Sequence, residues 1–222
     1  AFGSRALVPE PVPMTTDTIF DIASLTKPLG TTLAVLVLAE RAKLSLDAPL
    51  GRYLEEFRGR AFKDVTLRRM LSHTAGLPAI PAPGTLNGGF PRGARALARR
   101  PRDYPPGAGL QYSDTGFILL GELVRRVGGH RLDHYLERLL FRPLGLTDTT
   151  FHPKAARHAR IAPTEFHNGR LLQGEVHDPR ARALGGIAGH AGMFSTASDL
   201  ARICRMLIDG GALGAQRVLK AS

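Results

Sequence analysis

Ser24 and Lys27 are the two residues whose types and spacing most directly suggest covalent chemistry. In a helix, positions i and i+3 share one face, so the Ser24 hydroxyl and the Lys27 amine can meet. A serine hydroxyl becomes a good nucleophile when a base takes its proton, and a desolvated lysine can act as that base near neutral pH. The first turn of a helix also stabilises negative charge on the serine oxygen. The spacing predicts acyl transfer, with Ser24 as nucleophile and Lys27 as a proton-handling partner.

The S-x-x-K spacing alone is weak evidence. A sequence with eight serines and five lysines among 222 residues contains about 0.2 such matches by chance. This sequence contains the pattern once. The competing interpretation is a serine that caps a helix beside an exposed lysine.

Tyr112 and Asp114 form a second candidate group, separated by Ser113. A tyrosine hydroxyl can relay a proton to a leaving group. The Asp114 carboxylate can hydrogen-bond Lys27 or a substrate amide. The competing interpretation is a buried tyrosine followed by an aspartate that caps a helix starting at Gly116. Because Asp114 can serve in both ways, Tyr112 stands as a catalytic candidate and Asp114 as a substrate-binding candidate.

Helices must position these groups, because strand signals are few and any sheet must be small or incomplete. A helix is predicted to begin at Ser24, since residues 31–43 are apolar with a period of about 3.6. Residues 78–92 are predicted to form a loop, and the basic run at 91–102 the solvated face of a helix. The single Cys204 is predicted to be buried. Capping and stop signals predict further helices over residues 65–71, 116–127, 132–141 and 200–208.

Composition favours an ordinary globular protein, 43% hydrophobic and 22% charged. The net charge of +11 raises nucleic-acid binding as an alternative. However, the sequence has neither zinc-finger spacing nor an aromatic RNA-binding motif, so we expect no nucleic-acid partner. We expect no transmembrane segment, because the apolar stretch at 33–39 is far shorter than the ~20 residues that span a bilayer. His130 and His134 have helical spacing but no evident third ligand, so we expect no metal and no cofactor.

Several segments, in order along the chain, resemble the signatures of the β-lactamase-related serine hydrolases. That group includes class C β-lactamases, D-Ala-D-Ala peptidases and related carboxylesterases. The resemblance extends over nearly the whole chain. The matching segments are residues 18–27 (TIFDIASLTK), 44–50 (LSLDAPL), 70–78 (MLSHTAGLP), 112–117 (YSDTGF), 143–146 (PLGL) and 189–201 (GHAGMFSTASDLA).

The resemblance implies an α/β (α+β) fold of the β-lactamase/transpeptidase type, with helices on an antiparallel sheet and an inserted all-helical region. Within one domain, we expect residues 1–58 and 186–222 to form the α/β region and residues 59–185 the mainly helical region. The resemblance also implies a mechanism. Ser24 attacks an ester or amide carbonyl, Lys27 and Tyr112 share the proton transfers, and water releases the acyl group.

Two departures from the family pattern affect the expected site. Asp114 stands where asparagine is commoner, which puts a negative charge beside Lys27 and can shift the base role to Tyr112. A K-T-G or H-T-G tripeptide, expected on a strand after the last helix, is missing, so we expect a chain that is truncated at both ends. His190 superficially resembles that tripeptide's histidine and stands as a substrate-binding candidate. His177 and Asp178 are expected to border the pocket.

The predicted function is that of a serine hydrolase that forms an acyl-enzyme on an ester, amide or β-lactam carbonyl of a small-molecule or peptide substrate. Esterase or peptidase activity is favoured over dedicated β-lactamase activity. The alternative is a catalytically silent penicillin-binding-like module of the same fold. A bacterial protein is expected, with a periplasmic or extracellular location favoured over a cytoplasmic one. The sequence leaves the oligomeric state open.

Overall fold

Helices dominate the computed structural model, which describes residues 1–221. The α-helices are α1 (Leu33–Glu40), α2 (Leu67–Leu71), α3 (Phe90–Arg99), α4 (Asp114–Gly128), α5 (Leu132–Leu136), α6 (Pro179–Ala183) and α7 (Ala197–Ile208). The π-helical segments are η2 (Lys27–Thr32) and η6 (Glu137–Phe141), and the 3₁₀ segments are η1 (Ala23–Leu25), η3 (Leu50–Arg52), η4 (Glu55–Phe57), η5 (Arg60–Phe62) and η7 (Ala155–Arg160).

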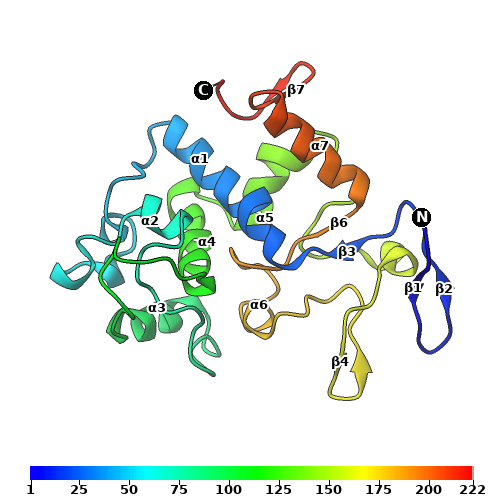
Figure 1. Ribbon diagram of the computed structural model, residues 1–222, viewed down its shortest axis with the longest axis horizontal. Coiled ribbons are helices and arrows are strands. Elements are labelled where there is room, and N and C mark those ends of the chain that lie inside the picture. The colour runs from blue at the N-terminus through cyan, green and yellow to red at the C-terminus, as the bar shows by residue number, and fades with distance from the viewer. Residues whose placement is uncertain (222) are drawn as a thin grey trace.

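The strands are short and form separate antiparallel pairs. They are β1 (Ser4–Ala6) with β2 (Val12–Pro13), β3 (Phe20–Asp21) with β6 (Phe194–Ser195), β4 (Phe166–His167) with β5 (Arg170–Leu171), and β7 (Ala212–Leu213) with β8 (Gln216–Arg217). In Figure 1 the β1–β2 and β4–β5 hairpins project from one end of the molecule, away from α2, α3 and α4. The mixed architecture confirms the predicted helices with small antiparallel sheets.

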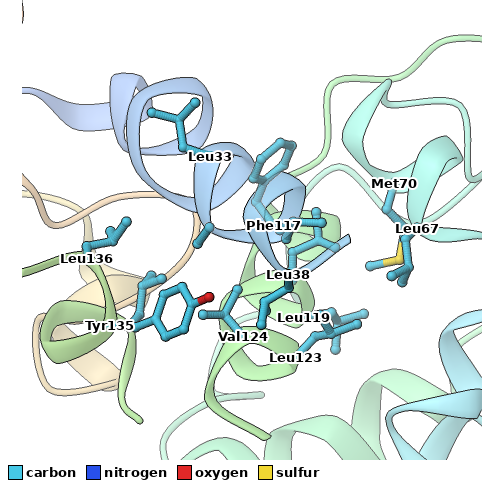
Figure 2. Close-up of a cluster of buried hydrophobic side chains, with 14 of the residues drawn as sticks. Leu33, Leu38, Leu67, Met70, Phe117, Leu119, Leu123, Val124, Tyr135 and Leu136 are labelled. Carbon is cyan, nitrogen blue, oxygen red and sulfur yellow. The ribbon is translucent and has the colours of Figure 1, made fainter. Parts of the chain in front are cut away.

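The main core lies where α1 crosses α4, with α2 and α5 on either side (Figure 1, Figure 2). Leu119 and Leu123 of α4 are completely buried, as is Leu136 of α5. Full burial of one such side chain contributes about 1.5–3 kcal/mol. The side chains labelled in Figure 2 are Leu33, Leu38, Leu67, Met70, Phe117, Leu119, Leu123, Val124, Tyr135 and Leu136. Because α1 and α4 each follow a segment that carries candidate site residues, this core fixes where those segments meet.

Most predicted helices are present, with shifts at their ends. The helix predicted from Ser24 is α-helical only from Leu33, because 3₁₀ and π turns precede it. Helix α3 begins at Phe90, inside the predicted loop, and its arginines Arg92, Arg95 and Arg99 are exposed. This confirms the basic run as a solvated helix face.

The competing interpretation of Asp114 as a helix cap and the prediction of a buried Cys204 are both wrong. Asp114 is not the cap of α4; Ser113 takes that place, and its hydroxyl accepts a hydrogen bond from the Gly116 N–H at 3.0 Å. The Asp114 carboxylate is thereby left available to the site. Cys204 is exposed rather than buried, because the buried face of α7 runs through Ile203 and Met206 instead.

The helical segment that begins near Ser24 is tied to a part of the chain far away in sequence. Strand β3 pairs with β6 just before it. The Met193 N–H donates to Thr26 Oγ1 at 3.2 Å, and Thr31 Oγ1 donates to the Gly189 carbonyl at 2.8 Å. Residues 20–31 and 189–195 therefore lie side by side, and the candidate nucleophile Ser24 belongs to the first of these segments.

Close backbone packing at Gly121 gives a prediction about stability. A Cβ atom at Gly121 would lie 2.8 Å from the Gly189 nitrogen, whereas one at Gly116 would meet its nearest atom at 3.6 Å. We expect Gly121→Ala to destabilise the protein by about 1–3 kcal/mol through overpacking. Gly116→Ala, in the same helix, is the matched control and should stabilise by up to about 1 kcal/mol. Urea unfolding of both variants measures the difference, and equal free energies of unfolding would contradict the packing argument.

The division into an α/β region and a mainly helical region stays a prediction; its last residue, Ser222, lies outside the described residues. Within residues 1–221, no helix combines the length and the apolar composition needed to cross a membrane.

Candidate active site

The Lys27 amine is the centre of the candidate site. Its side chain is 2% exposed, and its Nζ lies 2.8 Å from Ser24 Oγ, 2.8 Å from Asp114 Oδ1 and 3.1 Å from the His190 carbonyl oxygen. The predicted meeting of Ser24 with Lys27 is therefore present, and so is the predicted contact of Asp114 with Lys27. Sequence reasoning missed the third partner, because a main-chain carbonyl has no signature in side-chain types.

These three partners suit both protonation states of Lys27. An ammonium has three N–H donors and can donate to all three oxygens. A neutral amine can donate to Asp114 and to the His190 carbonyl, and its lone pair can accept the Ser24 O–H. In either state Asp114 and the His190 carbonyl thus accept two N–H groups of Lys27, and the remaining position of the nitrogen faces Ser24.

The turn before Ser24 is held in an unusual backbone conformation. Ala23 has a φ of +49°, a left-handed value that costs an L-residue roughly 1–2 kcal/mol. Its N–H donates to Asp21 Oδ1 at 2.8 Å. The other oxygen of this fully buried carboxylate accepts the His177 N–H at 2.9 Å and lies 2.9 Å from His177 Nδ1. Asp21 therefore holds the turn that presents the exposed Ser24, a contribution that sequence reasoning missed although Asp21 lies inside a recognised motif.

Tyr112 approaches Lys27 with its ring. The ring centroid lies 4.6 Å from Lys27 Nζ, a cation–π distance, and 4.5 Å from the centroid of the His73 ring. The side chain is half exposed, and across residues 1–221 no hydrogen bond engages its hydroxyl. The structure thus brings Tyr112 to the site, and its relay of a proton stays a prediction.

An open pocket of about 680 Å³ lies over Ser24 and Lys27. Apolar side chains form much of its wall, so a carbonyl bound above Ser24 would sit partly out of water. His73 and Tyr112 complete one side of it. The apolar residues in the lining include Leu25, Pro28, Leu71 and Phe117.

The buried His190 and the partly buried Asp178 form a pair behind Lys27. The His190 side chain is 1% exposed, and its Nε2 lies 2.8 Å from Asp178 Oδ1. In this arrangement the ring contacts Asp178 rather than the pocket, so substrate binding by His190 stays a prediction. Burial opposes ionisation of Asp178, but His190, the Ala181 N–H and Arg180 outweigh it and hold the pKa of that carboxyl well below its usual range.

Among the residues that the structure describes, one group could hold a metal ion: Asp114, Asp178 and His190, whose nearest ligand atoms lie within 4.8 Å of one another. A cation there would face the Lys27 amine, 2.8 Å from Asp114. The carboxylates already have N–H partners from Lys27 and from the start of α6. We therefore assign the group to an internal network of charges. The two histidines considered as metal ligands from spacing, His130 and His134, are exposed.

His73 leads to a prediction about pH. Its Nδ1 accepts the Ser113 N–H at 3.0 Å, which requires a neutral ring. Burial lowers the pKa of His73 below its usual 6.5, and the charge of Lys27 lowers it further while Asp114 opposes. As pH falls, His73 in the unfolded chain therefore binds a proton at a higher pH than His73 in the folded protein does. The contribution of His73 to the free energy of unfolding should be complete above about pH 6.5, and it should be lost as pH falls toward the lowered pKa of His73.

Urea unfolding between pH 7.5 and 5 tests this prediction. His73→Asn is the suitable variant, because asparagine tolerates the φ of +59° at this position. It should show a shallower loss of stability on acidification than the wild type. His134→Asn, at an exposed histidine, is the control and should keep the wild-type slope. An identical dependence of the free energy of unfolding on pH in all three proteins would mean that His73 does not contribute to it.

Comparison with known proteins identifies the family of this chain. The family model described as Beta-lactamase matches residues 1–222. The chain belongs to the beta-lactamase family. A protein of Escherichia coli K12, provisionally named D-alanyl-D-alanine carboxypeptidase, is 33% identical over 250 residues, which cover 96% of this chain and 56% of the relative. This chain thus spans little more than half the length of the relative.

Solved structures of related proteins share the architecture. A hydrolase with promiscuous acyltransferase activity, EstCE1, is 26% identical, with a TM-score of 0.72 over 95% of this chain and 63% of that one. A class C β-lactamase from Rhodobacter sphaeroides is 23% identical, with a TM-score of 0.77 over 93% and 56%. The latter likeness concerns the fold alone. Together with the family match, these structures confirm the β-lactamase/transpeptidase-like fold expected from the sequence.

Proposed function

We propose that the protein is a serine hydrolase that works through an acyl-enzyme on Ser24. The observation that carries this proposal is the Lys27 amine, buried and 2.8 Å from the exposed Ser24 hydroxyl at the floor of an open pocket. Membership of the beta-lactamase family supports it. So does the hydrolase activity named for a solved structure that is 26% identical.

The proposed reaction follows from the arrangement around Lys27. Ser24 Oγ bonds to the substrate carbonyl carbon while its proton passes to the neutral amine of Lys27. Asp114 and the His190 carbonyl keep the nitrogen in place as it becomes charged. The tetrahedral intermediate collapses, the leaving group takes a proton through Lys27 or Tyr112, and the acyl group stays on Ser24. A water molecule then attacks the ester, and the reverse proton transfers free the acid and restore Ser24.

Labelling of the full encoded protein with a fluorophosphonate probe tests the proposal. The adduct should map to Ser24 by mass spectrometry and be absent from Ser24→Ala. Ser113 and Ser195, whose hydroxyls are buried, serve as internal controls that should stay unmodified. An adduct on another residue, or labelling that persists in Ser24→Ala, would refute Ser24 as the nucleophile.

We propose esters and D-amino-acid peptides as substrates ahead of β-lactams. The E. coli relative is named for D-alanyl-D-alanine carboxypeptidase activity, and the segment at 189–201 resembles the general hydrolase branch of the family. We therefore expect the full encoded protein to hydrolyse a short-chain p-nitrophenyl ester faster than nitrocefin. Ser24→Ala supplies the background rate for both compounds. Faster nitrocefin turnover would reverse the proposed order of substrates.

The silent penicillin-binding-like module remains the second candidate, and one observation bears on it. Tyr112 meets Lys27 with its ring, 4.6 Å from Nζ, and its half-exposed hydroxyl has no hydrogen-bond partner within residues 1–221. Labelling of Ser24 by the fluorophosphonate without ester turnover would favour this candidate.

A periplasmic or extracellular location in a bacterium is also part of the proposal, and fractionation of the bacterial host tests it.

A further inference from the structure

We propose that His190 and Asp178 are positioning residues: together they fix the main-chain carbonyl of His190, which orients the Lys27 amine toward Ser24. This inference rests on the proposed function and concerns residues that support the catalytic ones. Neither side chain reaches the pocket over Ser24, so the two act through Lys27 rather than on the substrate.

Asp178 is the fixed end of this arrangement. It precedes α6, and its Oδ1 accepts the N–H groups of Arg180 and Ala181 at 2.9 and 2.8 Å. The same oxygen accepts from His190 Nε2 at 2.8 Å, and Arg180 contacts the other oxygen at 3.3 Å. A carboxylate held by the first turn of a helix has little freedom to move. It therefore offers His190 an anchor with a set position and a lasting negative charge.

His190 is held at one nitrogen and free at the other. Since Nε2 faces a carboxylate, Nε2 carries a proton, and the buried Nδ1 has no hydrogen-bond partner among the described residues. Leaving such a polar atom unpaired in the interior is unfavourable. An apolar side chain would avoid that cost but would lose the hydrogen bond to Asp178. That hydrogen bond fixes the backbone from which the His190 carbonyl projects.

The backbone around His190 is also fixed from the other side. The Gly189 carbonyl accepts from Thr31 Oγ1, four residues beyond Lys27. A Cβ atom at Gly189 would lie 2.0 Å from the Phe117 carbonyl oxygen, so this segment packs directly on the backbone of α4. Thr31 and Asp178 thus hold the two ends of a short segment whose carbonyl lies 3.1 Å from Lys27 Nζ.

His190 also lies close to Asp114, the carboxylate that contacts Lys27. The nearest ligand atoms of Asp114, Asp178 and His190 lie within 4.8 Å of one another. The charged groups around the ring are therefore Asp178 before α6, Asp114 on α4 and Lys27 on η2, with Arg180 behind Asp178. A second proton on His190 would place a positive charge near Asp114, the carboxylate that Lys27 uses. Removal of the imidazole should change both the position of the amine and the pH dependence of the reaction.

The test measures acylation of the full encoded protein over pH 5–9, as kcat and KM for a p-nitrophenyl ester and as the rate of fluorophosphonate labelling. His190→Leu removes the bond to Asp178, and we expect kcat to fall by up to about 10²-fold, the effect of misplacing a catalytic group by about 1 Å. KM should change little, and the pH profile should shift. His190→Gln keeps a side-chain donor and should recover part of the rate.

Asp178→Asn separates charge from folding, because asparagine still caps a helix. It should keep a cooperative unfolding transition and show the shifted pH profile. His134→Gln, at an exposed histidine of α5, is the control and should match the wild type. Folded His190 variants with wild-type kcat and pH profile would overturn the inference. A loss confined to KM would overturn it in favour of direct substrate contact. Full activity of Ser24→Ala is a different outcome, which removes the proposed function itself.

Discussion

Replacing Ser24 with alanine in the full encoded protein should lower kcat/KM for a p-nitrophenyl ester by about 10⁴-fold or more, the order seen when a nucleophilic serine is removed. The reason is that no other hydroxyl can take its place. Among the described residues Lys27 Nζ donates to one hydroxyl, that of Ser24. Thr32 and Tyr112 also bring hydroxyls to the pocket, but Lys27 makes no hydrogen bond to Thr32 among the described residues, and Tyr112 presents its ring to the amine.

Stability should change little in Ser24→Ala, by about 1 kcal/mol, because Lys27 keeps two of its three oxygen partners. Ser198→Ala, at an exposed serine of α7, is the control and should have wild-type activity. Ester hydrolysis by Ser24→Ala within tenfold of the wild type would falsify the assignment of the nucleophile. A matching loss in Ser198→Ala would show that the assay reports folding instead.

Replacing Lys27 with methionine should slow turnover by roughly 10²–10⁴-fold, the contribution typical of a general base. It should also destabilise the fold, because removal of Lys27 leaves the Asp114 carboxylate, 16% exposed, without its cation. Loss of one partner from a buried ion pair costs about 3–5 kcal/mol, and the partial exposure of Asp114 places this case at or below the lower end.

The double variant Lys27→Met/Asp114→Asn separates the two effects. Its neutral amide no longer needs the cation, so the free energy of unfolding should return most of the way to the wild-type value while activity stays low. Thermal unfolding and ester hydrolysis of the two variants make the comparison. If activity returned together with stability, the role of Lys27 would be structural.

The sequence predicted the helices and the main groups of the site because both depend on local patterns. Apolar periodicity and glycine caps located α4, and the i, i+3 spacing placed Lys27 against Ser24. The expected contact of Asp114 with Lys27 was also correct, although the cap of α4 is Ser113. The catalytic roles themselves stay predictions.

What local patterns could not predict are contacts whose partners are distant in sequence or belong to the main chain. The carbonyl of His190 has no residue-type signal, and its approach to Lys27 depends on the glycine packing between α4 and residue 189. Pairing of Asp178 with His190 required knowledge of where α6 begins. The left-handed Ala23 was equally hidden, because alanine rarely adopts that conformation.

The bond from Lys27 to the His190 carbonyl joins residues 163 positions apart, which bears on when the protein becomes reactive during its synthesis. A ribosome adding about 5–20 residues per second needs roughly 8–30 s to reach the second partner after the first. Until then Lys27 lacks one of its three oxygen partners, and the turn at Ser24 lacks the β3–β6 pairing. Such long-range contacts also form slowly in folding, because closure of a long loop precedes them. If Ser24 is acylated as proposed, we expect a nascent or partly folded chain to resist acylation, so that covalent labelling of Ser24 would report completed folding.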